Sequence, residues 1–373
     1  MRPVQHLAFA EKQLAPSRGE STEASGGLVK RLVLTVAGTV THSAGSSSVD
    51  RAGAIATLGD LKLTQDGSVI GSALAKDLFQ AYEIFLGGAS DQVDSDANGT
   101  VPIAGTLDLD FGRVMKGAAI DASGQHRVGY RVETLPATGY SSLATTYALS
   151  LKASIEHDGG VAAGPYLLPR PQYKVLDASV ASAQLYDEFI APANGFLLGI
   201  QVRTLDNSEP FRNRAVDGLI KRMKVRHIAT DGSGTSELVD TTWRQIRNLC
   251  RNRWRVPAIK LTGLAQVDDG LEPGVAIFPT FDPAGPSGAM RMRSNEKIQI
   301  YFDTTGTAES GYTNVAPGAG DQVFVTYHFF QPVNEGSADR AQRGVSQLSA
   351  VNARVARAAT TGRGSRRAAR RGR

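Results

Sequence analysis

The chain has almost no cysteine and no long apolar segment. Cys250 is the only cysteine among 373 residues, so no intrachain disulfide can form and the fold must hold without covalent cross-links. No stretch reaches the 18 consecutive apolar residues that a membrane-spanning helix needs. Glu11 and Lys12 interrupt the N-terminal apolar run, which is not typical of a secretory signal peptide. Together these absences favour synthesis in a reducing cytoplasm.

Recognisable catalytic motifs are also missing. The chain has no HExxH, GxSxG or CxxC motif, no phosphate-binding P-loop and no dinucleotide-binding GxGxxG motif. Its six histidines lie far apart in the sequence, at His6, His42, His126, His157, His227 and His328. We therefore expect a protein that is not an enzyme, with no catalytic residue, no cofactor and no resident metal.

One short segment resembles part of a cation-binding loop. Asp94, Asp96 and Asn98 alternate and are followed by Gly99, as in the first half of a calcium loop, where alternate oxygens wrap the ion. Position twelve of such a loop would be Gly105 rather than a bidentate glutamate, and no helix leads into it. A solvated turn is the favoured interpretation, and a weak calcium site stays open.

Glycine and proline are abundant and spread along the chain. Forty glycines and sixteen prolines indicate many tight turns, which an all-β protein needs. The content of 41% hydrophobic and 21% charged residues is typical of a globular protein. A length of 373 residues is enough for about two domains.

The strongest internal signal is a repeat. Ile55 to Phe85 recurs without a gap as Ile220 to Cys250, at an offset of 165 residues, and both copies contain Asp-Gly-Ser, at 66–68 and 231–233. In each copy a strand pattern precedes this turn and a helix pattern follows it. The expected apolar helix faces are Leu74, Leu78, Ala81, Tyr82 and Phe85 in the first copy and Val239, Trp243, Ile246 and Cys250 in the second.

The repeat loses its phase at the strands that open each copy. Between Arg31 to Val40 and Phe196 to Leu205, the inward-facing residues are out of step by one at this offset. Because a one-residue slip turns a strand over, a true duplication requires a small insertion nearby. The alternative is two β domains that merely share turn chemistry.

These patterns divide the chain into five parts. We expect an all-β fold of two tandem jelly-roll β-sandwiches, each with a short inserted helix, plus flexible N- and C-terminal arms. The parts are a polar N-terminal arm (1–27) that orders only against a partner, a first jelly roll (28–160), a proline-containing linker (161–194), a second jelly roll (195–333) and a basic tail (334–373).

The tail carries most of the positive charge. Residues 336–373 hold ten arginines and one acid, so the rest of the chain is net negative although the whole chain has a net charge of +5. Arginines spaced by small residues bind phosphate groups with little sequence preference, in a nucleic acid or in lipid headgroups. The candidate contact residues are Arg354, Arg357, Arg363, Arg366, Arg367, Arg370, Arg371 and Arg373. A solubilising appendage without a ligand is the alternative.

A second basic cluster lies inside the second copy of the repeat. Its members are Lys221, Arg222, Lys224, Arg226, Arg244, Arg247, Arg251, Arg253 and Arg255, with Trp243 and Trp254 between them. Trp243 falls on the apolar helix face and is expected in the core. We interpret the basic residues as subunit-interface residues that pair with the acidic body, against the alternative of a solvated face.

In the order of these elements the chain is similar to the double-jelly-roll major capsid proteins of tailless icosahedral bacteriophages with an internal membrane, the PM2-like and FLiP-like viruses. The resemblance implies a homotrimer that tiles an icosahedral shell, with minor capsid or vertex proteins as further partners. It also implies that the protein is made in the host cytoplasm and ends in the virion, where the tail meets viral membrane lipids or genome.

Two other functions remain open from the sequence. A non-enzymatic packaging or scaffold protein would depend on the tail for nucleic-acid binding. A β-sandwich hydrolase or sugar-binding protein would need a carboxylate pair or an aromatic platform in one cleft.

Overall fold

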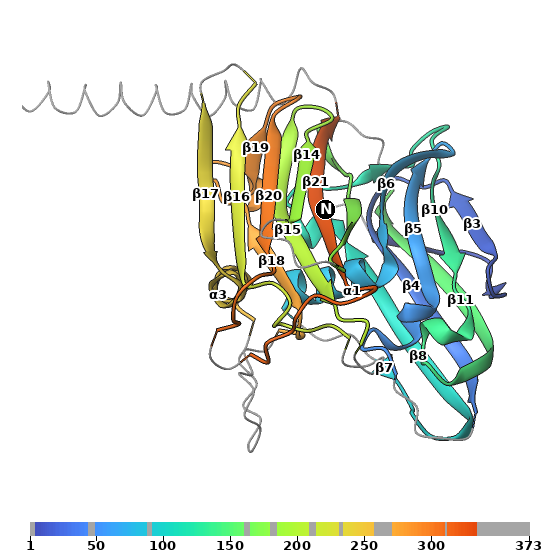
Figure 1. Ribbon diagram of the computed structural model, residues 1–373. Coiled ribbons are helices and arrows are strands. Elements are labelled where there is room, and N and C mark those ends of the chain that lie inside the picture. Colours follow the sequence, from blue (N-terminus) through green and yellow to red (C-terminus); the bar gives the residue numbers. More distant parts are fainter. Residues whose placement is uncertain are drawn as a thin grey trace, which may run out of the picture.

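The computed structural model describes residues 4–43, 49–87, 92–159, 165–179, 185–208, 214–230, 234–256, 271–309 and 312–333. These residues form two tandem β-sandwiches that lie side by side (Figure 1). Antiparallel pairing dominates both sandwiches, as the sequence predicts.

The first sandwich consists of two antiparallel sheets. One has the order β1 (Val4–Ala8), β11 (Ala144–Asp158), β4 (Leu28–His42), β8 (Gly99–Asp110) and β7 (Gln92–Val93), with β2 (Lys12–Gln13) beside β11 and β9 (Ile120–Asp121) beside β4. The other has the order β3 (Gly19–Ala24), β10 (Val128–Thr134), β5 (Leu58–Gln65) and β6 (Ser68–Leu74). Helix α1 (Ala75–Leu86) follows β6, and the short α2 (Phe111–Val114) follows β8.

The second sandwich repeats this arrangement, except that β7 has no counterpart beside β18. One sheet has the order β12 (Tyr166–Pro169), β21 (Gln322–Val333), β15 (Gly195–Leu205) and β18 (Val275–Pro279), with β13 (Gln172–Asp177) beside β21 and β19 (Met290–Met292) beside β15. The other has the order β14 (Leu185–Ile190), β20 (Lys297–Asp303), β16 (Arg222–Ile228) and β17 (Thr235–Thr242). Helix α3 (Trp243–Trp254) follows β17, as α1 follows β6, so the structure confirms the duplication.

A β-bulge in β15 explains why the repeat loses its phase. Leu197 is paired with Phe329, but the next pair joins Gly199 to His328, so β15 contains one extra residue opposite β21. Before the bulge Leu197 corresponds to Leu32 at the offset of 165 residues. After the bulge the inward-facing Ile200 and Val202 correspond to Leu34 and Val36, at an offset that is one residue larger. This bulge is the insertion that the duplication requires.

Each sandwich buries its own apolar faces. Leu32, Leu34 and Val36 of β4 alternate into the first core, because successive side chains of a strand point to opposite faces. Ile200 and Val202 of β15 take the same role in the second core. On its other face β15 is also buried, since α1 covers it, while α3 packs against the neighbouring β18.

The N-terminal arm and the linker differ from their predictions. The structure pairs β1 with β11 and β3 with β10 within the same chain, so residues 4–24 do not depend on a partner for order. Within 161–194, β12 and β13 pair with β21 and β14 pairs with β20. Prolines 169 and 171 are tolerated there because β12 and β13 lie at the edge of their sheet.

The helices are close to their expected places. Leu78, Ala81 and Tyr82 of α1, like Trp243, Ile246 and Cys250 of α3, are buried as predicted. Val239 was expected on the second helix but lies in β17, because that hairpin runs three residues further than its counterpart before the helix begins. Asp66 and Gly67 have positive φ angles, as the first Asp-Gly-Ser turn requires, whereas 231–233 lie outside the described residues.

Candidate assembly surfaces

The eight candidate contact arginines of the tail lie outside the described residues. Their contact with genome or lipid therefore remains a prediction from the sequence.

The Asp94 segment is held by neighbouring side chains of the first jelly roll. Tyr140 accepts a hydrogen bond from the backbone N–H of Ser95 at 3.1 Å, and His42 Nδ1 lies 2.9 Å from the carbonyl of Ala97. Asp96 and Asn98 are exposed. Among the described residues no group of three or more histidine, cysteine or acidic side chains is placed to hold a metal ion.

Several members of the second basic cluster pair within the chain rather than with another subunit. Arg222 lies 2.6 Å from Asp240, and Lys224 lies 2.6 Å from Glu237, across the β16–β17 hairpin. Cross-strand pairs of opposite charge stabilise such a hairpin. The interface interpretation is therefore corrected for these residues: they belong to the surface of one sheet.

Arg247 has a structural role in the core. Its side chain is 1% exposed, lies 2.8 Å from Asp217 and donates hydrogen bonds to the carbonyls of Glu272 and Val275. Asp217 also accepts a hydrogen bond from Trp243 Nε1 at 2.8 Å. A buried guanidinium that is satisfied in this way fixes α3 against the start of β18.

The interface between the two jelly rolls is built on one face of α1. Asp77 Oδ1 lies 2.5 Å from Nε of Arg203, and the backbone carbonyl of Asp77 accepts a hydrogen bond from Gln201 Nε2 at 2.9 Å. Asp77 is 1% exposed and Arg203 is 2% exposed. One helix of the first jelly roll is thus anchored on β15 of the second.

Aromatic rings continue the same interface. The ring centroid of Phe85 lies 5.3 Å from that of Trp254 and 4.9 Å from that of His328. Burial lowers the pKa of His328 to about 3, so the imidazole is neutral at ordinary pH. His328 Nε2 lies 3.2 Å from Oε1 of Gln201, so the aromatic cluster around Phe85 is linked to the hydrogen bond between Gln201 and Asp77.

Glu272 extends the contact beside β18. Gln80 of α1 donates a hydrogen bond to Glu272 Oε2 at 2.6 Å. Burial raises the pKa of Glu272 to about 7, although the nearby Arg51 guanidinium lowers it. The raised pKa thus belongs to a carboxyl group that lies where the two jelly rolls meet.

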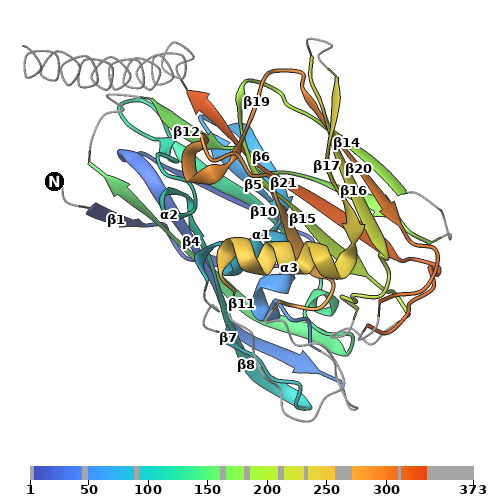
Figure 2. The ribbon, with the colours of Figure 1, turned by 90° about the vertical axis from the view of Figure 1, so that its left-hand side faces the viewer.

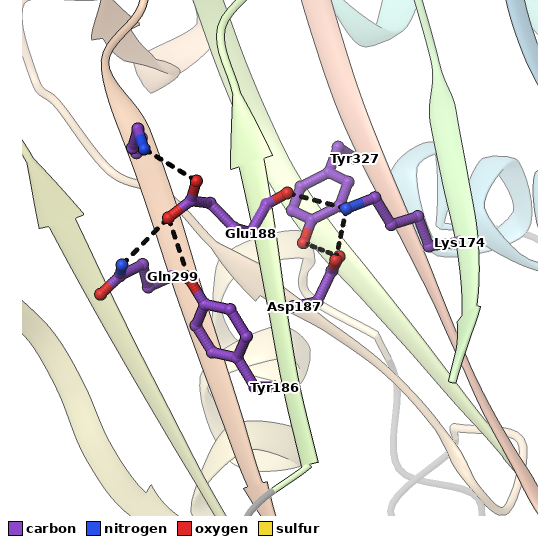
Figure 3. Close-up of polar contacts among 7 residues, drawn as sticks. Lys174, Tyr186, Asp187, Glu188, Gln299 and Tyr327 are labelled. Atoms are coloured by element: carbon purple, nitrogen blue, oxygen red, sulfur yellow. Dashed lines mark hydrogen bonds and ion pairs between the residues drawn. The ribbon is translucent and has the colours of Figure 1, made fainter. Parts of the chain in front are cut away.

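A second network joins the sheets of the second jelly roll (Figure 3). Asp187 of β14, which is 4% exposed, accepts hydrogen bonds from Lys174 of β13 at 2.6 Å and from Tyr327 of β21 at 2.5 Å. Lys174 also donates to the carbonyl of Glu188. Because β13 and β14 belong to opposite sheets, this network joins the two sheets along the edge that these strands form.

The Glu188 carboxylate takes no part in the hydrogen bonds of Asp187. Its oxygens accept hydrogen bonds from Tyr186, Lys297 and Gln299 at 2.8, 2.9 and 3.0 Å (Figure 3). The bonds from Gln299 and Lys297 lower the pKa of Glu188 to about 2. This arrangement fixes surface side chains on the β14–β20 sheet.

The residues of the interface between the jelly rolls were not predicted from the sequence. Asp77, Arg203 and Glu272 come from separate elements, and nothing in their local pattern pairs them. One signal was present: Gln201 and Arg203 are polar residues inside an apolar strand, and such residues need buried partners on the outer face.

Four sheets in tandem pairs, with a helix after the same hairpin in each half, define a double jelly roll, and the chain has this fold. It is the fold of a class of viral major capsid proteins. No protein-family profile and no curated protein sequence matches the chain. No helix among the described residues is both long and apolar enough to cross a membrane.

Among solved structures, the major capsid protein of Sulfolobus turreted icosahedral virus aligns over 88% of this chain and 96% of its own length, with 10% identity and a TM-score of 0.61. PBCV-1 VP54 aligns over 90% of this chain and 96% of its own, with 12% identity and a TM-score of 0.53. The major capsid protein P2 of bacteriophage PM2 aligns over 90% and 100%, with 10% identity and a TM-score of 0.49.

Proposed function

We propose that this chain is the major capsid protein of an icosahedral virus and that it acts as a structural subunit rather than as an enzyme. The observation that supports this most is the match to a viral major capsid protein over nearly the full length of both chains.

The contacts between the jelly rolls suit a building block of a shell. Asp77, Gln201 and Arg203 are all buried at their junction, so the two sandwiches are expected to move as one body. The paired sheets present mainly side chains for further contacts, which limits uncontrolled strand addition. We propose that three such bodies form a trimer and that trimers tile the virion shell.

Light scattering and electron microscopy test this proposal. The purified chain is expected to have a mass near three times 39.5 kDa in dilute buffer at both low and high salt, and concentrated samples are expected to form closed shells or flat arrays. A chain that stays monomeric at all concentrations and forms no array would contradict it. A species that forms only with nucleic acid would instead favour the packaging protein.

We further propose that the basic tail contacts anionic groups on the inside of the shell. Eight arginines between Arg354 and Arg373 provide the charge, and phosphates of a genome or of membrane lipids share the required chemistry. Minor capsid or vertex proteins are expected as additional partners in the virion.

Removal of residues 336–373 tests the role of the tail. Binding to a single-stranded oligonucleotide and to vesicles with anionic lipid is measured in parallel over a series of salt concentrations. The full chain is expected to bind at least one of the two with a steep salt dependence, which the truncated chain loses while its trimer mass is unchanged. Replacement of the eight arginines by lysine keeps the charge and is the matched control.

A further inference from the structure

The face of α1 that the second jelly roll covers is clearly defined. Asp77, Gln80, Ala81 and Ile84 are spaced as one face of a helix, and each is at most 8% exposed. Asp77 binds Gln201 and Arg203, and Gln80 binds Glu272, so this face meets the second jelly roll. It forms the contact between the two halves of the chain.

The same face of α3 is uncovered. Because α1 begins at Ala75 and α3 begins at Trp243, the corresponding residues are Gln245, Asn248, Leu249 and Asn252. All four are exposed, and Leu249 is 40% exposed. Within the chain, the helix of the first jelly roll contacts the second jelly roll. If the same contact is repeated by α3 of the second jelly roll, its partner is the first jelly roll of another chain.

The surface that receives α1 also has an uncovered counterpart. Gln201 lies between the inward-facing Ile200 and Val202, as Thr35 lies between Leu34 and Val36. Two register pairs follow the same correspondence. Gly199 and Gln201 are paired with His328 and Thr326, and Val33 and Thr35 are paired with Ser154 and Lys152.

These counterparts gather in one groove of the first jelly roll. The groove has a volume of about 250 Å³, and its lining includes Phe9, Glu11, Val33, Thr35, Lys152 and Ser154. It therefore occupies the place on the outer face of the β4 sheet that α1 covers on the outer face of the β15 sheet. Figure 2 shows α3 running along the front of the molecule, close to the strands of the second jelly roll.

We propose that a second copy of this chain supplies the missing partner: the Gln245–Asn252 face of α3 in one copy docks on the Thr35 groove of the next. This inference rests on the proposed capsid function. The contact is heterologous, so it must either close into a ring or grow without limit. Closure after three copies would give a ring of six jelly rolls joined alternately within and between chains.

The chemistry of the two surfaces agrees with a contact that forms after folding. The counterparts of Asp77 and Arg203 are Gln245 and Ala37, so the buried ion pair within the chain has no charged equivalent between chains. A subunit that has not yet assembled therefore does not expose one half of a buried ion pair to water.

The test is a charge placed on the α3 face. Leu249→Glu is expected to convert the trimer to a monomer at micromolar concentration, with an unchanged circular dichroism spectrum and thermal midpoint of the subunit. Leu238→Glu on β17 is the matched control, since Leu238 is 36% exposed on a different surface, and it is expected to stay trimeric. Cysteines at Gln245 and Thr35 provide a second measurement. A short bis-maleimide should link chains only when both are present, because Cys250 is buried.

The outcomes separate the two proposals. A wild-type trimer that survives Leu249→Glu, and that shows no linkage through Gln245→Cys and Thr35→Cys, overturns this interface and leaves the capsid function standing. A wild-type chain that is monomeric under all conditions overturns both. A trimer that is lost with Leu249→Glu, retained with Leu238→Glu and linked by the paired cysteines supports both.

Discussion

Nε of Arg203 and Oδ1 of Asp77 lie 2.5 Å apart, and this ion pair joins two halves of the chain that are 126 residues apart in sequence. Neither side chain is more than 3% exposed, so each charge has left water and depends on the other. The guanidinium also lies 3.8 Å above the ring of Phe324. The position of one jelly roll on the other is thus set partly by electrostatics.

Breaking this pair should destabilise the folded chain. We expect Asp77→Ala to lower the free energy of unfolding by about 3–5 kcal/mol, because it leaves Arg203 buried and unpaired. Denaturant titration measures the change. Asp240→Ala removes the partly exposed partner of Arg222 and Lys224 and should cost no more than about 1 kcal/mol. Equal losses in the two variants would show that the Asp77 pair is not buried in solution.

Glu272 should make stability fall as the pH rises. The pKa of its carboxyl is raised from 4.5 to about 7 in the folded chain, so the folded state holds its proton over a range in which the unfolded state has lost it. The penalty is absent below about pH 4.5, grows as the pH rises and is complete above about pH 7, at no more than about 3 kcal/mol. Glu272→Gln should remove it. The measurement is the difference in unfolding free energy between variant and wild type at pH 5 and pH 8; a difference that does not change with pH would contradict the assignment.

His328 should act in the opposite direction. Its pKa is lowered from 6.5 to about 3, so the unfolded state binds a proton that the folded state refuses. The stability associated with the neutral imidazole is full above about pH 6.5 and is lost as the pH falls toward 3. We expect His328→Gln to lose less stability than wild type between pH 7 and pH 4, as measured by thermal unfolding. His126, which is exposed and paired with Asp66, provides a surface histidine for comparison through His126→Gln.

Removal of one hydroxyl group from the network in Figure 3 should lower the free energy of unfolding. Tyr327→Phe removes the hydroxyl that donates to the buried Asp187 and should cost about 1–3 kcal/mol of unfolding free energy. Tyr186→Phe removes a similar hydroxyl from Glu188, but Tyr186 is 45% exposed and water can replace it, so the cost should be under about 1 kcal/mol. Chemical denaturation of both variants decides the point; a larger cost for Tyr186→Phe would contradict this ranking.

Much of the fold could be predicted from the sequence because duplication leaves a visible period. The offset of 165 residues located both hairpins and both helices, and alternation located β8, β10 and β20. The strands of the N-terminal arm and of the linker were missed for a physical reason. They are edge strands with one partner each, and in β3 and β13 no side chain is fully buried and no regular apolar pattern is present.

The contacts that join the halves could not be predicted in the same way. Asp77 and Arg203 are both charged residues, and only the fold brings them together in a place without water. The opposite error occurred at Arg222 and Lys224, whose density of charge suggested another subunit although their partners lie on the adjacent strand. Charge in a sequence indicates that a partner is needed, but not where the partner lies.

The bulge in β15 decides which side chains of the strand face the second core. If the same residues formed a regular strand from Leu197 onward, with no bulge, the rest of the strand would be turned over. Gln201 and Arg203 would then point into the second core, and Ile200 and Val202 would point toward α1. One bulged residue thus keeps Gln201 and Arg203 on the face that receives α1 and keeps Ile200 and Val202 in the second core.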